Sequence, residues 1–195
     1  MLELLKKFVA KNSDPREYMR SPFNRGEWTY ATNGHIAVRV PKIDGVEVLR
    51  EKHIPNLEGL FQSASGNDFI VLPTLPTPEN CQMCNGTGVA YECEECDGDG
   101  EFEHGSHTYK CKECDGHGQV AYSGGIDTVC RHCGGAGVTR YKPMQVGGSH
   151  FDLFYLHLIN GLPEAKFAPG AGRMDMARFV FDGGEGILMP MRVGD

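Results

Sequence analysis

Several motifs that would announce a function are missing from this chain of 195 residues. No run of about 18 apolar residues occurs, so the sequence predicts no membrane-spanning helix. There is no Gly-x-x-x-x-Gly-Lys-[Ser/Thr] phosphate-binding loop and no His-Glu-x-x-His phrase of a zinc hydrolase. Because no residue stands out as a nucleophile, we expect a protein that is not an enzyme.

Cysteine is absent from most of the chain and is confined to residues 81–137. There the phrase Cys-x-x-Cys-x-Gly-x-Gly occurs four times. Four thiolates satisfy the tetrahedral coordination of zinc, and the glycines suit a tight knuckle with positive φ. We predict two structural zinc ions, held by eight cysteines: Cys81, Cys84, Cys93, Cys96, Cys111, Cys114, Cys130 and Cys133.

The eight cysteines have two other interpretations. An even number in a short region could form disulfides. However, the first ten residues carry charges inside their apolar run and do not resemble a secretory signal, so we expect a reducing, cytoplasmic location. A redox-active protein needs only one such pair, although reactive thiols remain an alternative hypothesis for the function.

The excess of acidic over basic residues is confined to the same segment. Residues 81–137 contain ten acidic and three basic residues, a difference of −7 that equals the formal net charge of the chain. The charges of the flanking residues cancel, with sixteen acidic and sixteen basic residues. A negative field repels phosphate backbones, so we expect this segment to contact a protein partner rather than nucleic acid.

The four phrases resemble the cysteine-rich domain of DnaJ-type chaperones, over about the middle third of the chain. The resemblance implies an extended β-hairpin in which the first and fourth phrases share one zinc ion and the second and third share the other. The implied sites are Cys81, Cys84, Cys130 and Cys133, and Cys93, Cys96, Cys111 and Cys114. No His-Pro-Asp tripeptide occurs in these residues, so we do not expect the J-domain of these chaperones.

The N-terminal flank is expected to begin with a helix. Residues 2–11 have apolar residues at helical spacing, and their polar side carries Lys6, Lys7 and Lys11. A solvated helix face is the common role of such charges, and contact with phosphates is the alternative.

A β-hairpin is expected next. Residues 27–32 and 35–40 are rich in β-formers and are joined by Asn33-Gly34, which predicts a type I′ turn with Thr32 opposite His35. Beyond the cysteines we expect a helix at 150–159 with Ser149 as its N-cap, a strand at 165–168 and a hairpin of strands 176–181 and 187–192.

The flanks resemble a second family, the bacterial sliding clamp, which is the β subunit of the replicative polymerase. Ile187-Leu-Met-Pro-Met-Arg192 resembles its C-terminus, and Thr29-Tyr-Ala-Thr-Asn-Gly-His35 resembles one of its hairpins. The resemblance implies an α+β fold with a clamp-like pair of βαβββ units. Residues 1–79 and 140–195 would form this host domain, and residues 80–139 would be an inserted zinc module.

The clamp resemblance also implies binding surfaces. Its helices face DNA, which makes Lys6, Lys7 and Lys11 candidate DNA contacts. Its C-terminal tail helps to line a pocket for partner peptides, which corresponds to Met189, Pro190, Met191 and Arg192. A clamp ring needs six such domains and this chain has room for one, and residues 150–159 contain no lysine or arginine.

From these features we expect a non-enzymatic zinc-binding protein that serves as a protein-interaction or DNA-replication-associated clamp-like module. Its expected partners are a protein at the acidic zinc module and DNA at the basic N-terminal helix, with no membrane partner and with an oligomer possible. The alternative is a chaperone-like protein that holds exposed peptide segments with the zinc module.

Overall fold

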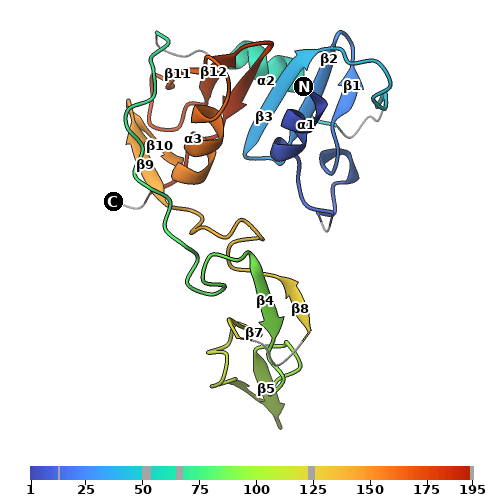
Figure 1. Ribbon diagram of the computed structural model, residues 1–195, viewed down its shortest axis with the longest axis vertical. Helices are drawn as coiled ribbons and strands as arrows, with labels where there is room; N and C mark the ends of the chain where they lie inside the picture. Colours follow the sequence, from blue (N-terminus) through green and yellow to red (C-terminus); the bar gives the residue numbers. More distant parts are fainter. Residues whose placement is uncertain (13, 50–53, 65–67, 123–125, 194–195) are drawn as a thin grey trace. The chain divides into compact units, whose positions relative to one another are not determined.

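The computed structural model describes residues 1–12, 14–49, 54–64, 68–122 and 126–193. The chain forms two compact units (Figure 1): one comprises Met1–Leu75 with Pro143–Asp195, and the other is Pro76–Lys142. We name the first unit the host domain and the second the zinc module. The fold is α+β and mostly strands, and no helix in the described ranges is long and apolar enough to cross a membrane.

The host domain is built on one antiparallel sheet of order β1-β2-β3-β13-β12-β11. Each end of the chain contributes three consecutive strands, and the two sets join where β3 pairs with β13. The strands are β1 (Phe23–Arg25), β2 (Trp28–Thr32), β3 (Ile36–Pro41), β11 (Lys166–Ala168), β12 (Ala177–Phe181) and β13 (Gly184–Leu188).

Short helical elements cover both faces of this sheet. They are α1 (Leu2–Leu5), the 3₁₀ turns η1 (Lys6–Phe8) and η2 (Glu17–Met19), α2 (Leu57–Ser63) and α3 (Leu153–Asn160). Because neighbouring residues of a strand point to opposite sides, Val38 and Ala37 of β3 face different layers. The Val38 face packs against α1, η1 and α3, and the Ala37 face packs against α2.

The predicted N-terminal helix is shorter than expected. Leu5 and Phe8 are fully buried, which anchors α1 and η1 to the sheet, but the helical turns end at Phe8. Lys6 and Lys7 therefore lie in η1, and Lys11 lies beyond it.

The predicted hairpin is present, but its register is shifted. Thr32 pairs with Ala37 rather than with His35, so Gly34 and His35 form the turn. The Asn33 side chain accepts hydrogen bonds from the amides of His35 and Ile36, at 3.0 and 3.2 Å, and only Gly34 has positive φ. A type I′ turn needs positive φ at both central residues, so the predicted turn type is wrong. Positive φ at the first central residue alone is typical of a type II′ turn.

The start of the second long helix was also predicted wrongly. Ser149 is not its N-cap but begins strand β10 (Ser149–Asp152), which pairs with β9 (Pro143–Val146). Helix α3 starts after Asp152, whose carboxylate accepts a hydrogen bond from the amide of Phe154 at 3.0 Å. Residues 150–152, which were predicted to be helical, have a spacing that fits either a helix or a strand, and pairing with β9 selects the strand.

The C-terminal elements agree better with the prediction made from the sequence. The strand expected at 165–168 is β11, and the strand expected at 176–181 is β12. Strand β13 begins three residues earlier than predicted and ends at Leu188, so residues 189–192 follow the sheet rather than belong to it.

Both edges of the six-stranded sheet are covered by the chain itself. In β1, Asn24 donates its amide to the carbonyl of Glu47 at 2.7 Å and accepts the amide of Leu49 at 3.1 Å. In β11, Phe167 and Ile70 exchange both of their backbone hydrogen bonds, each 2.8 Å long. The outward-pointing peptide groups of the edge strands are therefore already paired, which protects the sheet from edge-to-edge association.

The zinc module contains a three-stranded sheet of order β7-β4-β8 and a separate hairpin, β5-β6. Its strands are β4 (Val89–Glu92), β5 (Glu101–His104), β6 (His107–Lys110), β7 (Gln119–Val120) and β8 (Asp127–Val129). Besides the cysteines, only Ala90, Gln119 and Val120 are buried side chains among its described residues. Because the module has so little apolar core, bound metal must supply much of its folding free energy.

Candidate metal centres

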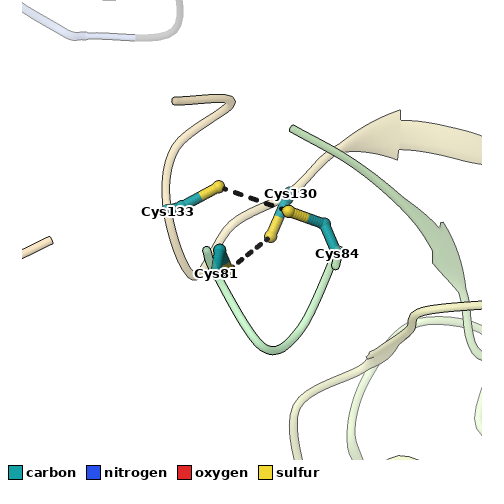
Figure 2. Close-up of side chains that lie close together, drawn as sticks. All are labelled: Cys81, Cys84, Cys130 and Cys133. Atoms are coloured by element: carbon teal, nitrogen blue, oxygen red, sulfur yellow. Dashed lines mark hydrogen bonds between the residues drawn. The ribbon is translucent and has the colours of Figure 1, made fainter. Parts of the chain in front are cut away.

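The four Cys-x-x-Cys-x-Gly-x-Gly phrases, which we call knuckles and number in chain order, meet in two buried clusters. One contains Cys81, Cys84, Cys130 and Cys133, and the other contains Cys93, Cys96, Cys111 and Cys114. Within each cluster all four sulfur atoms lie within 4.8 Å of one another. Figure 2 shows the first cluster, in which two chain segments that are far apart in sequence turn their sulfurs toward a common centre.

The spacing of the sulfur atoms fits a tetrahedral zinc site. The Sγ atoms of Cys81 and Cys130 are 3.9 Å apart. The other three cross-knuckle distances are 3.7 Å (Cys84 to Cys133), 3.8 Å (Cys93 to Cys111) and 3.7 Å (Cys96 to Cys114). A tetrahedron with Zn–S bonds of about 2.3 Å places its sulfurs about 3.8 Å apart, whereas a disulfide bond is about 2.05 Å long. The prediction of two structural zinc ions is confirmed in this sense, and all eight cysteines are free of disulfides.

Each knuckle also donates backbone hydrogen bonds to its own sulfur. The amide of the second glycine points at Sγ of the second cysteine in all four phrases: Gly88 to Cys84 (3.3 Å), Gly100 to Cys96 (3.1 Å), Gly118 to Cys114 (3.2 Å) and Gly137 to Cys133 (3.3 Å). These bonds orient the sulfur and stabilise its negative charge, as outer-sphere groups commonly do in metal sites.

The two knuckles of each site are joined by reciprocal backbone hydrogen bonds. The amide of Cys81 donates to the carbonyl of Gly137 at 2.9 Å, and the amide of Cys130 donates to that of Gly88 at 2.9 Å. In the second cluster, the amides of Cys93 and Cys111 donate to the carbonyls of Gly118 and Gly100, at 3.0 and 2.8 Å. Each site is therefore built with approximate two-fold symmetry from two equivalent knuckles.

One feature of the knuckles was missed in the sequence. The residue before the first glycine of each phrase also has positive φ: Asn85 (50°), Asp97 (50°), Asp115 (49°) and Gly134 (69°). Asparagine, aspartate and glycine are the residues that best tolerate this left-handed conformation. Their recurrence at this position is the sequence signal that could have been read.

The thiol pKa values reflect burial and amide contacts. Burial raises the pKa of Cys93 and of Cys130 to about 12. Burial also opposes ionisation of Cys84, but hydrogen bonds from the amides of Gly88 and Gly86 and from the thiols of Cys133 and Cys81 together outweigh it and lower the pKa of Cys84 to about 7. Four thiolates can share one buried site only if a cation neutralises them, and zinc supplies that charge by displacing the protons.

A buried glutamine links the two metal sites. The side-chain carbonyl of Gln119, which follows the third knuckle, accepts the amide of Arg131 in the fourth knuckle at 2.8 Å. Its amide group donates to the Thr128 hydroxyl at 2.7 Å and to the Val129 carbonyl at 3.2 Å. The Arg131 guanidinium in turn donates to the carbonyl of Gly98 in the second knuckle at 3.3 Å.

The candidate partner pocket is only partly assembled from the residues expected. Met189 lines a host-domain pocket of 220 Å³ together with mainly apolar side chains, among them Met19, Leu57, Leu60 and Ile187. Pro190, Met191 and Arg192 are not among its lining residues.

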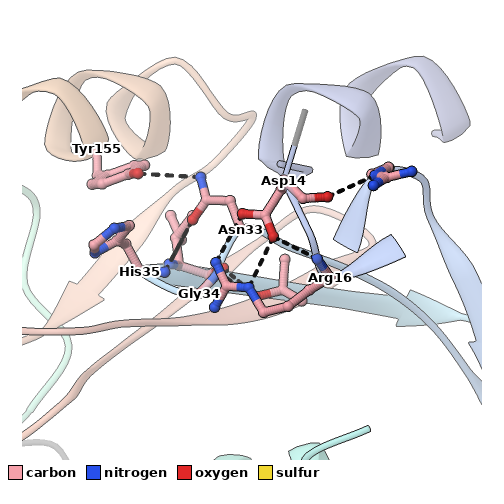
Figure 3. A network of polar contacts seen from close by, with 9 residues as sticks. Asp14, Arg16, Asn33, Gly34, His35 and Tyr155 are labelled. Carbon is pink, nitrogen blue, oxygen red and sulfur yellow. Dashed lines mark hydrogen bonds and ion pairs between the residues drawn. The ribbon is translucent and has the colours of Figure 1, made fainter. Parts of the chain in front are cut away.

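A polar network beside this pocket holds the β2-β3 turn (Figure 3). The Asn33 amide group donates to the Tyr155 hydroxyl at 3.2 Å, and the His35 ring stacks on Tyr155. Arg16 lies against Gly34 and donates two side-chain hydrogen bonds to Asp14, each 2.9 Å long. These bonds lower the pKa of Asp14 to about 2.

The candidate DNA contacts are exposed on the host domain. Lys6 and Lys7 lie in η1, Lys11 follows it, and all three are exposed. Lys6 forms an ion pair with Glu3 at 2.6 Å, which partly neutralises its charge.

Sequence reasoning also missed a buried charge in the host domain. Arg39 is 8% exposed and lies between the rings of Trp28 and Phe61, 4.4 and 4.3 Å from their centres. It forms ion pairs with Glu58 at 2.8 Å and Glu185 at 2.7 Å. The signal was a single charge within the apolar strand 36–40, and its role is to join β3, β13 and α2.

A comparison of the chain with models of protein families gives no match, and a comparison with the sequences of curated proteins gives none.

Proposed function

We propose that this chain is a non-enzymatic binding protein in which zinc builds a rigid display module on a clamp-like host domain. The observation that carries the proposal is the closed coordination of both metal sites. Each cluster offers four buried sulfurs, so a bound zinc ion has no position left for water or substrate. A metal in such a site organises the chain and leaves recognition to the surrounding surface.

Two features of the host domain support the clamp-like assignment. Each end of the chain contributes helical turns followed by three consecutive antiparallel strands, and the two sets meet at β3 and β13. Helix α3 and the N-terminal turns pack on the same face of the sheet. Each half therefore gives the αβββ part of a βαβββ unit to the sheet, which supports the clamp-like assignment, although no strand precedes α1 among the described residues and β9-β10 forms a sheet of its own.

The covered sheet edges favour a reused clamp fold over a ring. Rings built by extending one sheet into the next need free edge strands, and the outward peptide groups of Asn24 and Phe167 are already bonded within the chain. The role that remains is recognition of partners by a single host domain and its zinc module.

The pocket beside Met189 supports a peptide partner at the host domain. Its volume of 220 Å³ suits one or two apolar side chains, and its lining is mainly apolar. The exposed lysines Lys6, Lys7 and Lys11 support an additional DNA contact, although α3 contains no lysine or arginine.

A capture experiment tests this proposal. Full-length chain and a variant without the zinc module are used as baits in an extract of the native cells, and Trp28 fluorescence verifies the host fold. We expect partners that require the module and others that persist without it. If no captured protein depends on the module, its proposed role in display is wrong. The chaperone-like alternative instead predicts that the intact chain suppresses aggregation of unfolded clients.

A further inference from the structure

The hairpin β5-β6 of the zinc module has one face made entirely of rings. Phe102 lies directly opposite Tyr109, and His104 lies directly opposite His107. Because alternate residues of a strand share a face, all four rings lie on the same side of the hairpin. The rings of His107 and Tyr109 are 6.4 Å apart.

This aromatic face is unpartnered within the described chain. All eight residues of the two strands are exposed, Phe102 to 40% and Tyr109 to 54%. Neither ring belongs to any of the apolar clusters of the molecule. Exposed apolar groups that gather on one face of a small module mark a binding surface more often than scattered ones do.

The surroundings of the face determine which partner it suits. A hollow of 470 Å³ is lined by Phe102 and by five carboxylates, from Glu95, Asp97, Asp99, Glu101 and Glu103. No ion pair involving these five is found in the described ranges. Residues 92–103 contain seven acidic and no basic residues.

Rings and unpaired carboxylates together recognise a particular kind of cation. A guanidinium stacks on an aromatic ring and binds a carboxylate with two parallel hydrogen bonds, which an ammonium group cannot do. We propose that the aromatic face of β5-β6 docks an arginine-rich segment of a partner protein. The inference rests on the proposed function in that the zinc module is taken to contact a protein.

The second metal site makes this surface rigid. A two-stranded hairpin is marginally stable alone. Here the amide of Cys111 donates to the carbonyl of Gly100 at 2.8 Å at the base of the hairpin, so both strands leave directly from the second cluster. Zinc in that cluster therefore fixes the separation of the strands that carry the rings.

The test uses the zinc-loaded full chain and a short labelled peptide in which arginine alternates with serine. Fluorescence anisotropy should show binding that weakens steeply with salt. Replacing both Phe102 and Tyr109 by alanine should reduce the affinity roughly tenfold, because two cation–π contacts are lost. The matched control replaces Val89 and Val129, an exposed cross-strand pair of the other sheet, by alanine and should leave the affinity unchanged.

A charge variant tests the carboxylates. Asp97→Asn with Asp99→Asn removes two charges, and asparagine retains the tolerance for positive φ that position 97 requires. We expect weaker peptide binding with zinc content unchanged. Asp127→Asn, an exposed acid of β8 outside the hollow, is the control and should bind normally.

Two results would overturn the inference. One is a peptide with leucine in place of arginine that binds as tightly, and the other is binding that survives loss of both rings. Using the Phe102 and Tyr109 variant as bait separates this inference from the proposed function. Capture that needs the module but not the rings contradicts only the arginine-docking face, whereas capture that never needs the module contradicts the proposed function.

Discussion

The carbonyl oxygen of Gly135 lies 2.5 Å from the point that a β-carbon on Gly88 would occupy. On the other side of the same site, Gly137 stands in the same relation to the carbonyl of Gly86, also at 2.5 Å. The first and fourth knuckles thus touch through glycines whose missing side chains let the two backbones approach. The second and third knuckles meet in the same way at Gly100 and Gly118.

This contact makes Gly88→Ala a sharp test of the first zinc site. The new methyl group would push the knuckles apart, and position 88 also needs a φ of 78°. We expect zinc affinity at the first site to fall about 10- to 100-fold, with the second site unchanged. Competition with a zinc-binding dye measures both.

Gly105→Ala is the matched control for Gly88→Ala. Gly105 has a φ of 62° but no atom within 4 Å of its missing β-carbon. The Gly105→Ala substitution therefore introduces backbone strain without a steric clash, and both zinc ions should remain tightly bound. Tight zinc binding by Gly88→Ala would refute the close-contact explanation.

Cys96→Ser tests whether the module depends on metal while the host does not. Structural zinc contributes on the order of 10 kcal/mol per site, so the variant should lose the second ion and the order of the hairpin. The host keeps its own core, with Phe8, Phe151 and Phe179 fully buried. Zinc analysis and the fluorescence of Trp28, the single tryptophan, report on the two units separately. A changed Trp28 signal would contradict their independence.

Gln119→Ala should weaken retention of both zinc ions. The side chain is 2% exposed, and its loss leaves the Arg131 amide and the Thr128 hydroxyl without this partner. Such a loss costs about 1–3 kcal/mol. Release of zinc to a chelator should be faster from both sites, whereas the exposed Gln145→Ala should behave as the unaltered chain. Release from one site alone would show that Gln119 does not couple them.

Glu185 should make host stability depend on pH. Burial opposes its ionisation, but hydrogen bonds from Arg39 and Arg178 outweigh burial and lower the pKa of Glu185 below the ordinary 4.5. Since the folded-state pKa is the lower one, the carboxylate stabilises the fold above pH 4.5, and this contribution disappears as the pH falls through the folded-state value.

Glu185→Gln measures that contribution. We expect it to lower the free energy of unfolding by about 2 kcal/mol at neutral pH and to differ less from the unaltered chain on acidification. Urea unfolding followed by Trp28 fluorescence gives both values. If the difference in free energy of unfolding between Glu185→Gln and the unaltered chain stays constant down to low pH, the effect comes from side-chain packing and not from the carboxylate charge.

The DNA contact is tested by reversing the charges of Lys6, Lys7 and Lys11. If the N-terminal turns contact phosphates, binding of a labelled duplex should fall steeply with salt and disappear when all three are replaced by glutamate. Lys166→Glu, an exposed lysine of β11, serves as the control and should bind normally. Absence of duplex binding by the unaltered chain at low salt would remove DNA from the list of partners.

The errors in the predicted elements have identifiable physical causes. Asn33-Gly34 indicated a hairpin correctly, yet the register depended on the Asn33 side chain, which bonds the amides of His35 and Ile36 and moves the turn by one residue. Ser149–Asp152 fitted a helix until pairing with β9 was known. The N-terminal helix ended early once Leu5 and Phe8 were buried. At Ser149–Asp152 and at the N-terminus, contacts between distant residues overruled a weak local preference, whereas the hairpin register was set by local side-chain bonds.

The sequence by itself determined the chemistry of the metal sites, because a cysteine pair followed by two glycines carries its ligands, its turn and its amide donors within eight residues. It also determined that the net negative charge belongs to the zinc module. The tertiary structure decided how Gln119 joins the two sites and where four rings of β5-β6 gather on one face, and it brought together the knuckles whose pairing the family resemblance had implied. These features depend on the pairing of segments across the fold, and no local pattern encodes that pairing.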